Sequence, residues 1–169
     1  MKHNKGKVMK RQIKVKIFSR ESIEKMLQSS DIPKNVAVIS FYDTPMIEDD
    51  PYCVPVAYPK NIPVFYSQTD DIGGNDFEIR GMSAEIFFTD CDKMAKFVLE
   101  CVSKGIDTFY CQCEFGQSRS SATAAAIAEF FNGNGIEIFA DYKYCPNQVI
   151  YNKLLNSLTT QNFLKQIYG

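Results

Sequence analysis

One segment of the chain combines residue types that can carry out chemistry at a defined spacing. Residues 111–121 read CQCEFGQSRSS, so five residues, one of them Gly116, separate Cys113 from Arg119. A cysteine thiolate is a strong nucleophile, and the planar guanidinium of arginine can hold two oxygens of a phosphoryl group at once. This pair therefore predicts nucleophilic attack on a phosphate-like substrate.

The elements expected on either side of this pair explain why its spacing matters. Residues 107–112 are predicted to form a strand, and residues 119–131 an Ala-rich helix that Asn132 and Gly133 close. A short loop between a strand and a helix can turn its backbone N–H groups inward, where the helix dipole adds positive potential. We therefore expect residues 114–118 to bind an anion, in a field that favours the thiolate of Cys113.

The remaining elements alternate between strands and helices along the chain. Strands are predicted at 13–18, 35–42 and 64–66. Helices are predicted at 19–28, at 89–104 with Thr89 as the N-cap, and from Pro146 onward. The proline-rich stretch 44–63 is expected to be mainly surface loop. This alternation predicts an α/β fold, a single domain with a mostly parallel central sheet flanked by helices.

The charges divide the chain into a basic arm and an acidic body. Residues 1–20 carry eight Lys or Arg and no acidic residue, which leaves eleven basic against twenty acidic residues elsewhere, a net charge of −9. We expect residues 1–12 to form a basic N-terminal arm and residues 13–169 to form the catalytic domain. The acidic body argues against nucleic acid as a partner.

The cysteines and apolar segments exclude several other classes of protein. The six cysteines form no C-x-x-C pair, and His3 is the only histidine, so no metal site and no cofactor are expected. No apolar stretch is long enough to cross a membrane, and none follows the basic start as in a signal peptide. Reduced thiols and a cytoplasmic location are therefore expected, with no membrane partner.

The loop from Cys113 to Arg119 resembles that of the protein tyrosine phosphatase superfamily. The Arg-Ser ending before an Ala-rich helix is most similar to the dual-specificity branch, in particular to small phosphatases of bacterial type, and the resemblance extends loosely over residues 60–155. It implies a cysteine-dependent phosphatase that hydrolyses phosphotyrosine or a related phosphomonoester through a phosphocysteine intermediate. Its substrate would be a phosphorylated protein or a small phosphomonoester, and phosphate or sulfate would also bind in the loop.

The resemblance also implies roles for individual residues. Cys113 would be the nucleophile, Arg119 would bind the phosphoryl group and stabilise the transition state, and Ser120 would donate a hydrogen bond to the thiolate. Gly116 would let the loop pass close to the phosphate. The residues expected to contact the substrate are those of the loop: Glu114, Phe115, Gly116, Gln117, Ser118 and Arg119.

The family also requires a general acid on a separate loop. Asp71 is the first choice and Asp70 the alternative, because both follow the strand predicted at 64–66, upstream of the cysteine. Asp90 and Asp92 are closer to the cysteine in sequence. They are interpreted instead as residues of a first helical turn, where the dipole stabilises their charge.

Two departures from the family pattern affect activity and substrate. Gln112 stands where the family usually has a histidine that helps organise the loop, which predicts slower turnover. Between Cys113 and Arg119 the only charged residue is Glu114, whereas family members that act on polyphosphorylated lipids often carry Lys there. The loop therefore favours phosphotyrosine or a related monoester over highly anionic substrates.

Other functions remain open at this point. The chain could be a catalytically weak phosphate-binding module that keeps the loop without efficient turnover. Sulfur transfer and arsenate reduction also use a cysteine in an anion-binding loop, and Cys111 or Cys145 could serve as a resolving thiol. For Cys111, which shares a strand face with Cys113, we favour a small buried apolar residue over a redox partner.

Overall fold

The computed structural model describes residues 12–29, 32–48, 50, 53–73, 76–77, 80–81 and 83–168 of the 169. All of the expected basic arm except Gln12 lies outside the described residues. Within them, four parallel strands form one sheet in the order β1-β4-β2-β3. The strands are β1 (Lys14–Ser19), β2 (Val36–Tyr42), β3 (Val64–Gln68) and β4 (Thr108–Cys113).

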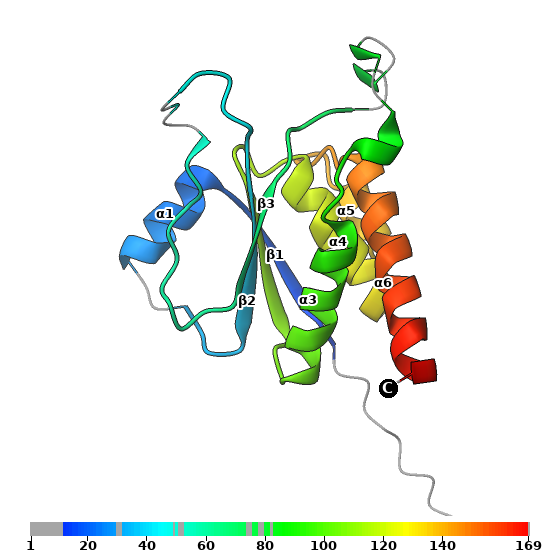
Figure 1. Ribbon diagram of the computed structural model, residues 1–169. Helices are drawn as coiled ribbons and strands as arrows, with labels where there is room; N and C mark the ends of the chain where they lie inside the picture. The colour runs from blue at the N-terminus through cyan, green and yellow to red at the C-terminus, as the bar shows by residue number, and fades with distance from the viewer. Residues whose placement is uncertain are drawn as a thin grey trace, which may run out of the picture.

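Helices cover both faces of this sheet (Figure 1). Helix α1 lies against one face, and the other helices lie on the opposite side. The helices are α1 (Arg20–Ser29), α3 (Cys91–Ser103), α4 (Arg119–Asn132), α5 (Ile136–Ala140) and α6 (Gln148–Tyr168), with a 3-10 turn at Ala84–Ile86. The predicted single-domain α/β fold with a parallel sheet is therefore confirmed. None of the helices described is both long and apolar enough to span a membrane.

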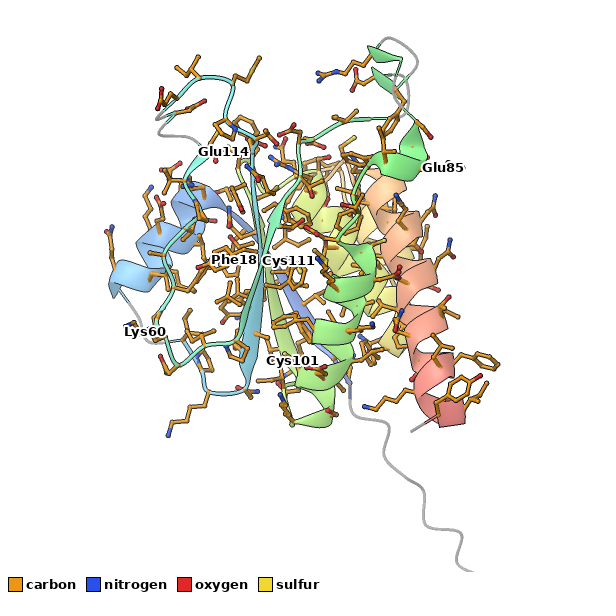
Figure 2. All side chains as sticks on the ribbon, viewed as in Figure 1. Phe18, Lys60, Glu85, Cys101, Cys111 and Glu114 are labelled. Carbon is orange, nitrogen blue, oxygen red and sulfur yellow. The ribbon has the colours of Figure 1, made fainter. Side chains whose placement is uncertain are left out.

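The central strand β4 is buried along its whole length. On one face, Phe109, Cys111 and Cys113 join the core formed with α3, α4 and α6. On the other face, Tyr110 joins a smaller cluster formed with α1 and the β2–β3 loop. In Figure 2, Cys111 lies in the interior, with Glu114 toward one end of the sheet and Cys101 toward the other. Cys113, the candidate nucleophile, is therefore the last residue of a strand that is buried on both faces.

The start of two helices differs from the sequence prediction. Asp90, not Thr89, precedes the first residue of α3, and its side chain makes no capping bond, since its backbone is already in the helical region. Its Oδ2 instead accepts from the Ser67 hydroxyl at 3.2 Å. Helix α6 starts after Pro146, because Asn147 Oδ1 accepts hydrogen bonds from the N–H groups of residues 149 and 150. The end of α4 is as predicted, with Gly133 in the left-handed conformation.

Candidate active site

The carboxyl ends of the parallel strands meet at one edge of the sheet, where α/β proteins commonly bind ligands. Cys113 ends β4, Asp43 follows β2, and Thr69 follows β3. The segment 114–118 then leads directly into α4. Segments far apart in the sequence therefore converge around the loop between Cys113 and Arg119, called here the cradle.

Neighbouring segments hold the cradle by its carbonyl groups. The carbonyl of Glu114 accepts from the N–H of Arg20 (3.0 Å), and that of Gln117 from the N–H of Cys145 (3.0 Å). The carbonyl of Ser118 accepts from the N–H groups of residues 122 and 147 (2.9 and 3.3 Å). Because C=O and N–H of a planar trans peptide point in opposite directions, these contacts direct the paired N–H groups toward the inside of the cradle. This is the arrangement that an anion requires.

The first turn of α4 adds further donors to the cradle. Ser118 occupies the N-cap position of α4, but its side chain makes no capping hydrogen bond there. Its hydroxyl instead donates to Asp71 Oδ1 at 2.7 Å. The N-terminal amides of this 14-residue helix therefore have no side-chain cap, which suits binding of an anion at the positive end of the dipole.

Gly116 is needed for a reason that the sequence did not indicate. Its φ of 69° lies in the left-handed region, and a Cβ on this residue would lie 2.6 Å from the backbone nitrogen of Ser19 and 2.8 Å from the carbonyl carbon of Phe18. The cradle is pressed against the end of β1, so only glycine fits. The constraint observed is the approach to a strand, in addition to any approach to phosphate.

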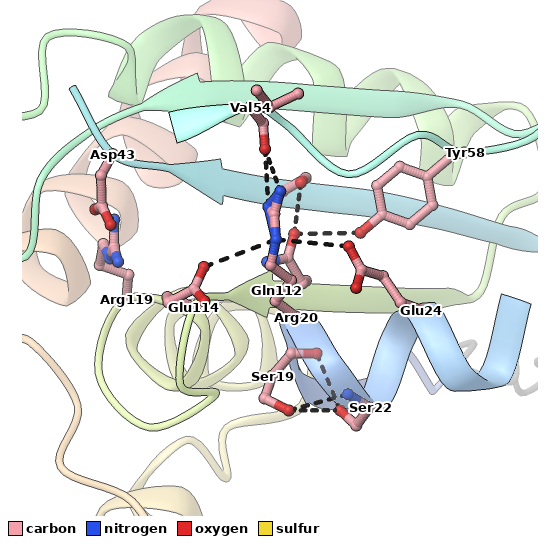
Figure 3. Close-up of polar contacts among 11 residues, drawn as sticks. Ser19, Arg20, Ser22, Glu24, Asp43, Val54, Tyr58, Gln112, Glu114 and Arg119 are labelled. Atoms are coloured by element: carbon pink, nitrogen blue, oxygen red, sulfur yellow. Dashed lines mark hydrogen bonds and ion pairs between the residues drawn. The ribbon is translucent and has the colours of Figure 1, made fainter. Parts of the chain in front are cut away.

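Arg119 is buried and held in place by two acceptors. Its side chain is 4% exposed, and Nη1 donates to Asp43 Oδ1 at 2.5 Å (Figure 3). Nη1 also donates to the carbonyl oxygen of Thr69 at 2.7 Å. Its Nε is buried and has no hydrogen-bond partner among the described residues. An unpaired buried donor on a cation is costly unless a ligand satisfies it. The guanidinium is thus fixed on one side and offers a free donor on the other.

Cys113 and Ser120 face each other inside the site. Both are buried, and the Cys113 sulfur lies 3.0 Å from the Ser120 hydroxyl oxygen. This contact is the geometry that a hydroxyl needs to donate a hydrogen bond to a thiolate.

Cys111 is completely buried on the same face of β4 as Cys113. Burial raises the pKa of its thiol well above the ordinary value, so this thiol stays protonated near neutral pH. Its surroundings support the interpretation as a small apolar core residue. Cys145, which the sequence also offered as a resolving thiol, is exposed.

The two acid candidates have different surroundings. Asp71 contacts the cradle through Ser118, and its Oδ1 also accepts from Asn147 Nδ2 at 3.1 Å. Asp70 is turned toward the β2–β3 side, where Oδ1 accepts from the N–H of Thr44 at 2.7 Å. Of the two, the structure brings Asp71 to the cradle. Asp92 lies in the first turn of α3, as the sequence indicates.

Gln112 points away from the cradle, to the α1 side of the sheet. Its side chain is buried, and Oε1 accepts from the hydroxyls of Ser40 (2.6 Å) and Tyr58 (3.3 Å), as Figure 3 shows for Tyr58. Burial raises the pKa of Tyr58 well above its ordinary value, so the phenol remains a donor at neutral pH. Gln112 therefore connects β4 to β2 and to the β2–β3 loop.

The outer side chains of the cradle form its rim. Phe115 is 78% exposed, Gln117 is exposed and Glu114 is half-buried. Arg20 beside the rim is occupied by the carbonyl of Val54 and by two carboxylates, those of Glu24 and Glu114 (Figure 3). A hollow of about 470 Å³ adjoins the other side, with Asp71, Ser118, Cys145, Pro146, Asn147, Gln148, Val149 and Asn152 among its lining residues.

Three residues around the cradle were not identified from the sequence: Asp43, Thr69 and Asn147. Asp43 had a usable signal, because it directly follows a buried strand and parallel strands bring their carboxyl ends to one edge. Thr69 contributes only a carbonyl oxygen, so its identity carries no signal. In the part of the chain that the structure describes, no group of three or more His, Cys, Asp or Glu residues could hold a metal ion.

Comparison with known proteins places the fold. No family model matches the chain, and no curated protein matches it. Among solved structures, PTPMT1 in complex with PI(5)P superposes with a TM-score of 0.53 at 13% identity, over 90% of this chain and 94% of that chain. A second structure of PTPMT1 gives a TM-score of 0.50 at 17% identity, over 90% and 95%. The chain therefore has the fold of PTPMT1.

Proposed function

We propose that the chain is a cysteine-dependent phosphatase that hydrolyses phosphotyrosine or a related phosphomonoester through a phosphocysteine intermediate. One observation carries this proposal. Arg119 is buried and anchored by Nη1, and its Nε has no partner within the described part of the chain; it begins a helix whose N-cap side chain makes no capping bond, after a loop that starts with a cysteine at the end of a strand. A phosphoryl group in the cradle would satisfy that Nε and the inward N–H groups together.

In the first step the Cys113 thiolate attacks phosphorus, so an S–P bond forms as the bond to the ester oxygen breaks. Arg119 and the N–H groups of the cradle stabilise the charge that develops on the phosphoryl oxygens. Asp71 gives its proton to the departing ester oxygen, which leaves as an alcohol or phenol. The position of Asp71 beside Ser118 supports this role.

In the second step water attacks phosphorus and the S–P bond breaks. Asp71, now a carboxylate, accepts a proton from the water, and the product is inorganic phosphate. The sulfur leaves as a thiolate, and the 3.0 Å contact with Ser120 supports a hydrogen bond that stabilises it. Each group then returns to its starting protonation state.

The charge of the site supports a monoester with one phosphate as substrate. PTPMT1 has been crystallised with PI(5)P, a phosphoinositide. Here the rim carries Glu114 and no lysine, and Arg20 is already bound to two carboxylates. A second phosphate would therefore meet negative charge without a free cation from these residues. The dual-specificity branch, the small bacterial type and a cytoplasmic location remain predictions from the sequence.

The test is hydrolysis of an aryl phosphate without added metal, across pH 5 to 8, by the wild type and by Cys113→Ser. We expect turnover by the wild type and its loss in Cys113→Ser, whose hydroxyl is a far weaker nucleophile. Vanadate or phosphate binding is measured on the same samples. Folded protein that binds these anions without turnover at any pH would overturn the enzyme assignment in favour of a phosphate-binding module.

A further inference from the structure

Asn147, at the N-terminus of α6, connects three segments of the site. It is 7% exposed, and Nδ2 donates to Asp71 Oδ1 (3.1 Å) and to the carbonyl oxygen of Ile72 (2.9 Å). Its Oδ1 accepts from the N–H groups at the start of α6, and its own N–H donates to the carbonyl of Ser118 (3.3 Å). Asn147 thus links the loop of the acid candidate to α6 through its side chain, and both of them to the cradle through its backbone N–H.

The two ends of this side chain do different things. Capping of α6 needs only Oδ1, because a cap accepts hydrogen bonds from the first N–H groups of the helix. The Nδ2 group has no part in capping, and both of its contacts go to Asp71 and Ile72. A role as a helix cap therefore accounts for the contacts of Oδ1 but not for those of Nδ2.

Among the residues that the structure describes, the hydrogen bonds to the Asp71 carboxyl group go to one of its oxygens. Oδ1 accepts from Asn147 Nδ2 and from the Ser118 hydroxyl at 2.7 Å, and neither of these contacts involves Oδ2. The residue is exposed, so without these donors its carboxyl group would be free to rotate. Two fixed donors on Oδ1 orient the group and leave Oδ2 to carry a transferable proton.

We propose that Asn147 is a positioning residue for general-acid catalysis by Asp71. Through Nδ2 it holds the Asp71 carboxyl group beside Ser118 of the cradle, at the edge of the adjoining hollow of about 470 Å³. Through Oδ1 it fixes this arrangement to α6, which is anchored in the core by Ile150, Leu154 and Leu158. The inference rests on the proposed phosphatase function with Asp71 as the acid.

The test uses the dependence on leaving group, which a merely structural role would not change. Phenyl phosphate needs a proton on its leaving oxygen, whereas dinitrophenyl phosphate does not. Asn147→Ser keeps an oxygen that can cap α6 but removes Nδ2. We expect kcat/KM to fall about tenfold for phenyl phosphate and less than about twofold for dinitrophenyl phosphate, because a displaced acid affects only the protonated departure.

A double-mutant cycle with Asp71→Asn isolates the coupling. If Asn147 acts through Asp71, Asn147→Ser has no further effect on either substrate in the Asp71→Asn background. Asn132→Ser is the matched control: Asn132 also bridges segments, holding the backbone N–H and carbonyl of Ile13 at 3.1 and 2.7 Å, but at the far end of α4. For Asn132→Ser, the ratio of kcat/KM to the wild-type value should be the same for phenyl phosphate and for dinitrophenyl phosphate.

The outcomes separate this inference from the proposed function. Equal losses on both substrates in Asn147→Ser, or an additional loss in the double variant, would overturn the positioning role. Absence of any Cys113-dependent hydrolysis would instead overturn the proposed function. If Asn147→Ser does not fold, Asn147→Thr replaces it, because its hydroxyl oxygen can also cap α6 and it too lacks Nδ2; the same larger loss with phenyl phosphate than with dinitrophenyl phosphate is expected.

Discussion

The cradle is held from two sides that differ in burial and in charge. On one side Arg119 is buried and bound to Asp43 by an ion pair and to the carbonyl of Thr69. On the other side Asp71 is exposed and bound by neutral donors, the Ser118 hydroxyl and the Asn147 amide. The contacts expected to bind phosphate therefore lie at the ends of the core strands, while the proposed acid depends on a few polar contacts near the surface.

This difference predicts two kinds of sensitivity. Changes on the Arg119 side should lower binding and transition-state stabilisation for every phosphate ester, whatever its leaving group. Changes on the Asp71 side should matter only where the leaving oxygen needs a proton. The following variants test that division.

The largest effect is expected for Arg119→Lys. A lysine ammonium cannot replace the planar fork that binds Asp43 and the phosphoryl oxygens at the same time. We expect kcat/KM to fall about a thousandfold, equally for phenyl and dinitrophenyl phosphate. A loss below about tenfold, or one that grows with the pKa of the leaving group, would contradict the division between the two sides.

Asp71→Asn should give the opposite pattern. The amide cannot donate a proton to the leaving group, so we expect a loss of about a hundredfold with phenyl phosphate and little change with dinitrophenyl phosphate. Asp70→Asn serves as the control, because the Asp70 carboxylate binds the N–H of Thr44 and not the cradle. If instead Asp70→Asn lost activity with phenyl phosphate and not with dinitrophenyl phosphate, the acid would be Asp70.

A smaller effect is expected for Asp43→Asn. The amide keeps the size of the side chain and can still accept a hydrogen bond, but it removes the ion pair that orients Arg119. We expect kcat/KM to fall about tenfold for both substrates, since the arginine is less well fixed. Measurement of kcat/KM on both substrates checks this. A loss confined to phenyl phosphate would instead mean that Asp43 supports protonation of the leaving group.

Gln112→Met should affect stability more than activity. Methionine has a similar volume but cannot accept the hydrogen bonds of Ser40 and Tyr58, so two hydroxyls lose a buried acceptor. We expect the free energy of unfolding in denaturant to fall by about 1–3 kcal/mol. Adding Ser40→Ala and Tyr58→Phe should recover part of the loss, because no donor is then left without a partner. No recovery would show that these hydrogen bonds are not the cause.

The contiguous part of the site could be predicted from the sequence, and the scattered part could not. Cys113, Arg119 and Ser120 lie within eight residues of one another, between a strand and a helix that hydrophobic patterning identifies. The parallel sheet followed from strands alternating with helices in the same way. These features depend on local spacing, which a single sequence contains.

The supporting contacts depend on distances in space that local spacing does not encode. Asp43 and Asn147 come from segments separated from the residues they bind by 76 positions. Which of Asp70 and Asp71 contacts the cradle depends on their side-chain directions, which differ although the residues are adjacent. The sequence predicts that a glycine is needed at position 116. It does not show the close approach to the backbone of β1, nearly a hundred residues earlier, which a side chain at this position would block.

Trapping of the covalent intermediate tests the central claim most directly. Asp71→Asn protein is mixed with dinitrophenyl phosphate, quenched in acid and analysed by mass spectrometry, since loss of the base in the second step should let the intermediate accumulate. The account predicts a phosphoryl group on Cys113, and none when Cys113→Ser is added to this variant. A phosphoryl group on another residue, or turnover that survives Cys113→Ser, would contradict the phosphocysteine mechanism.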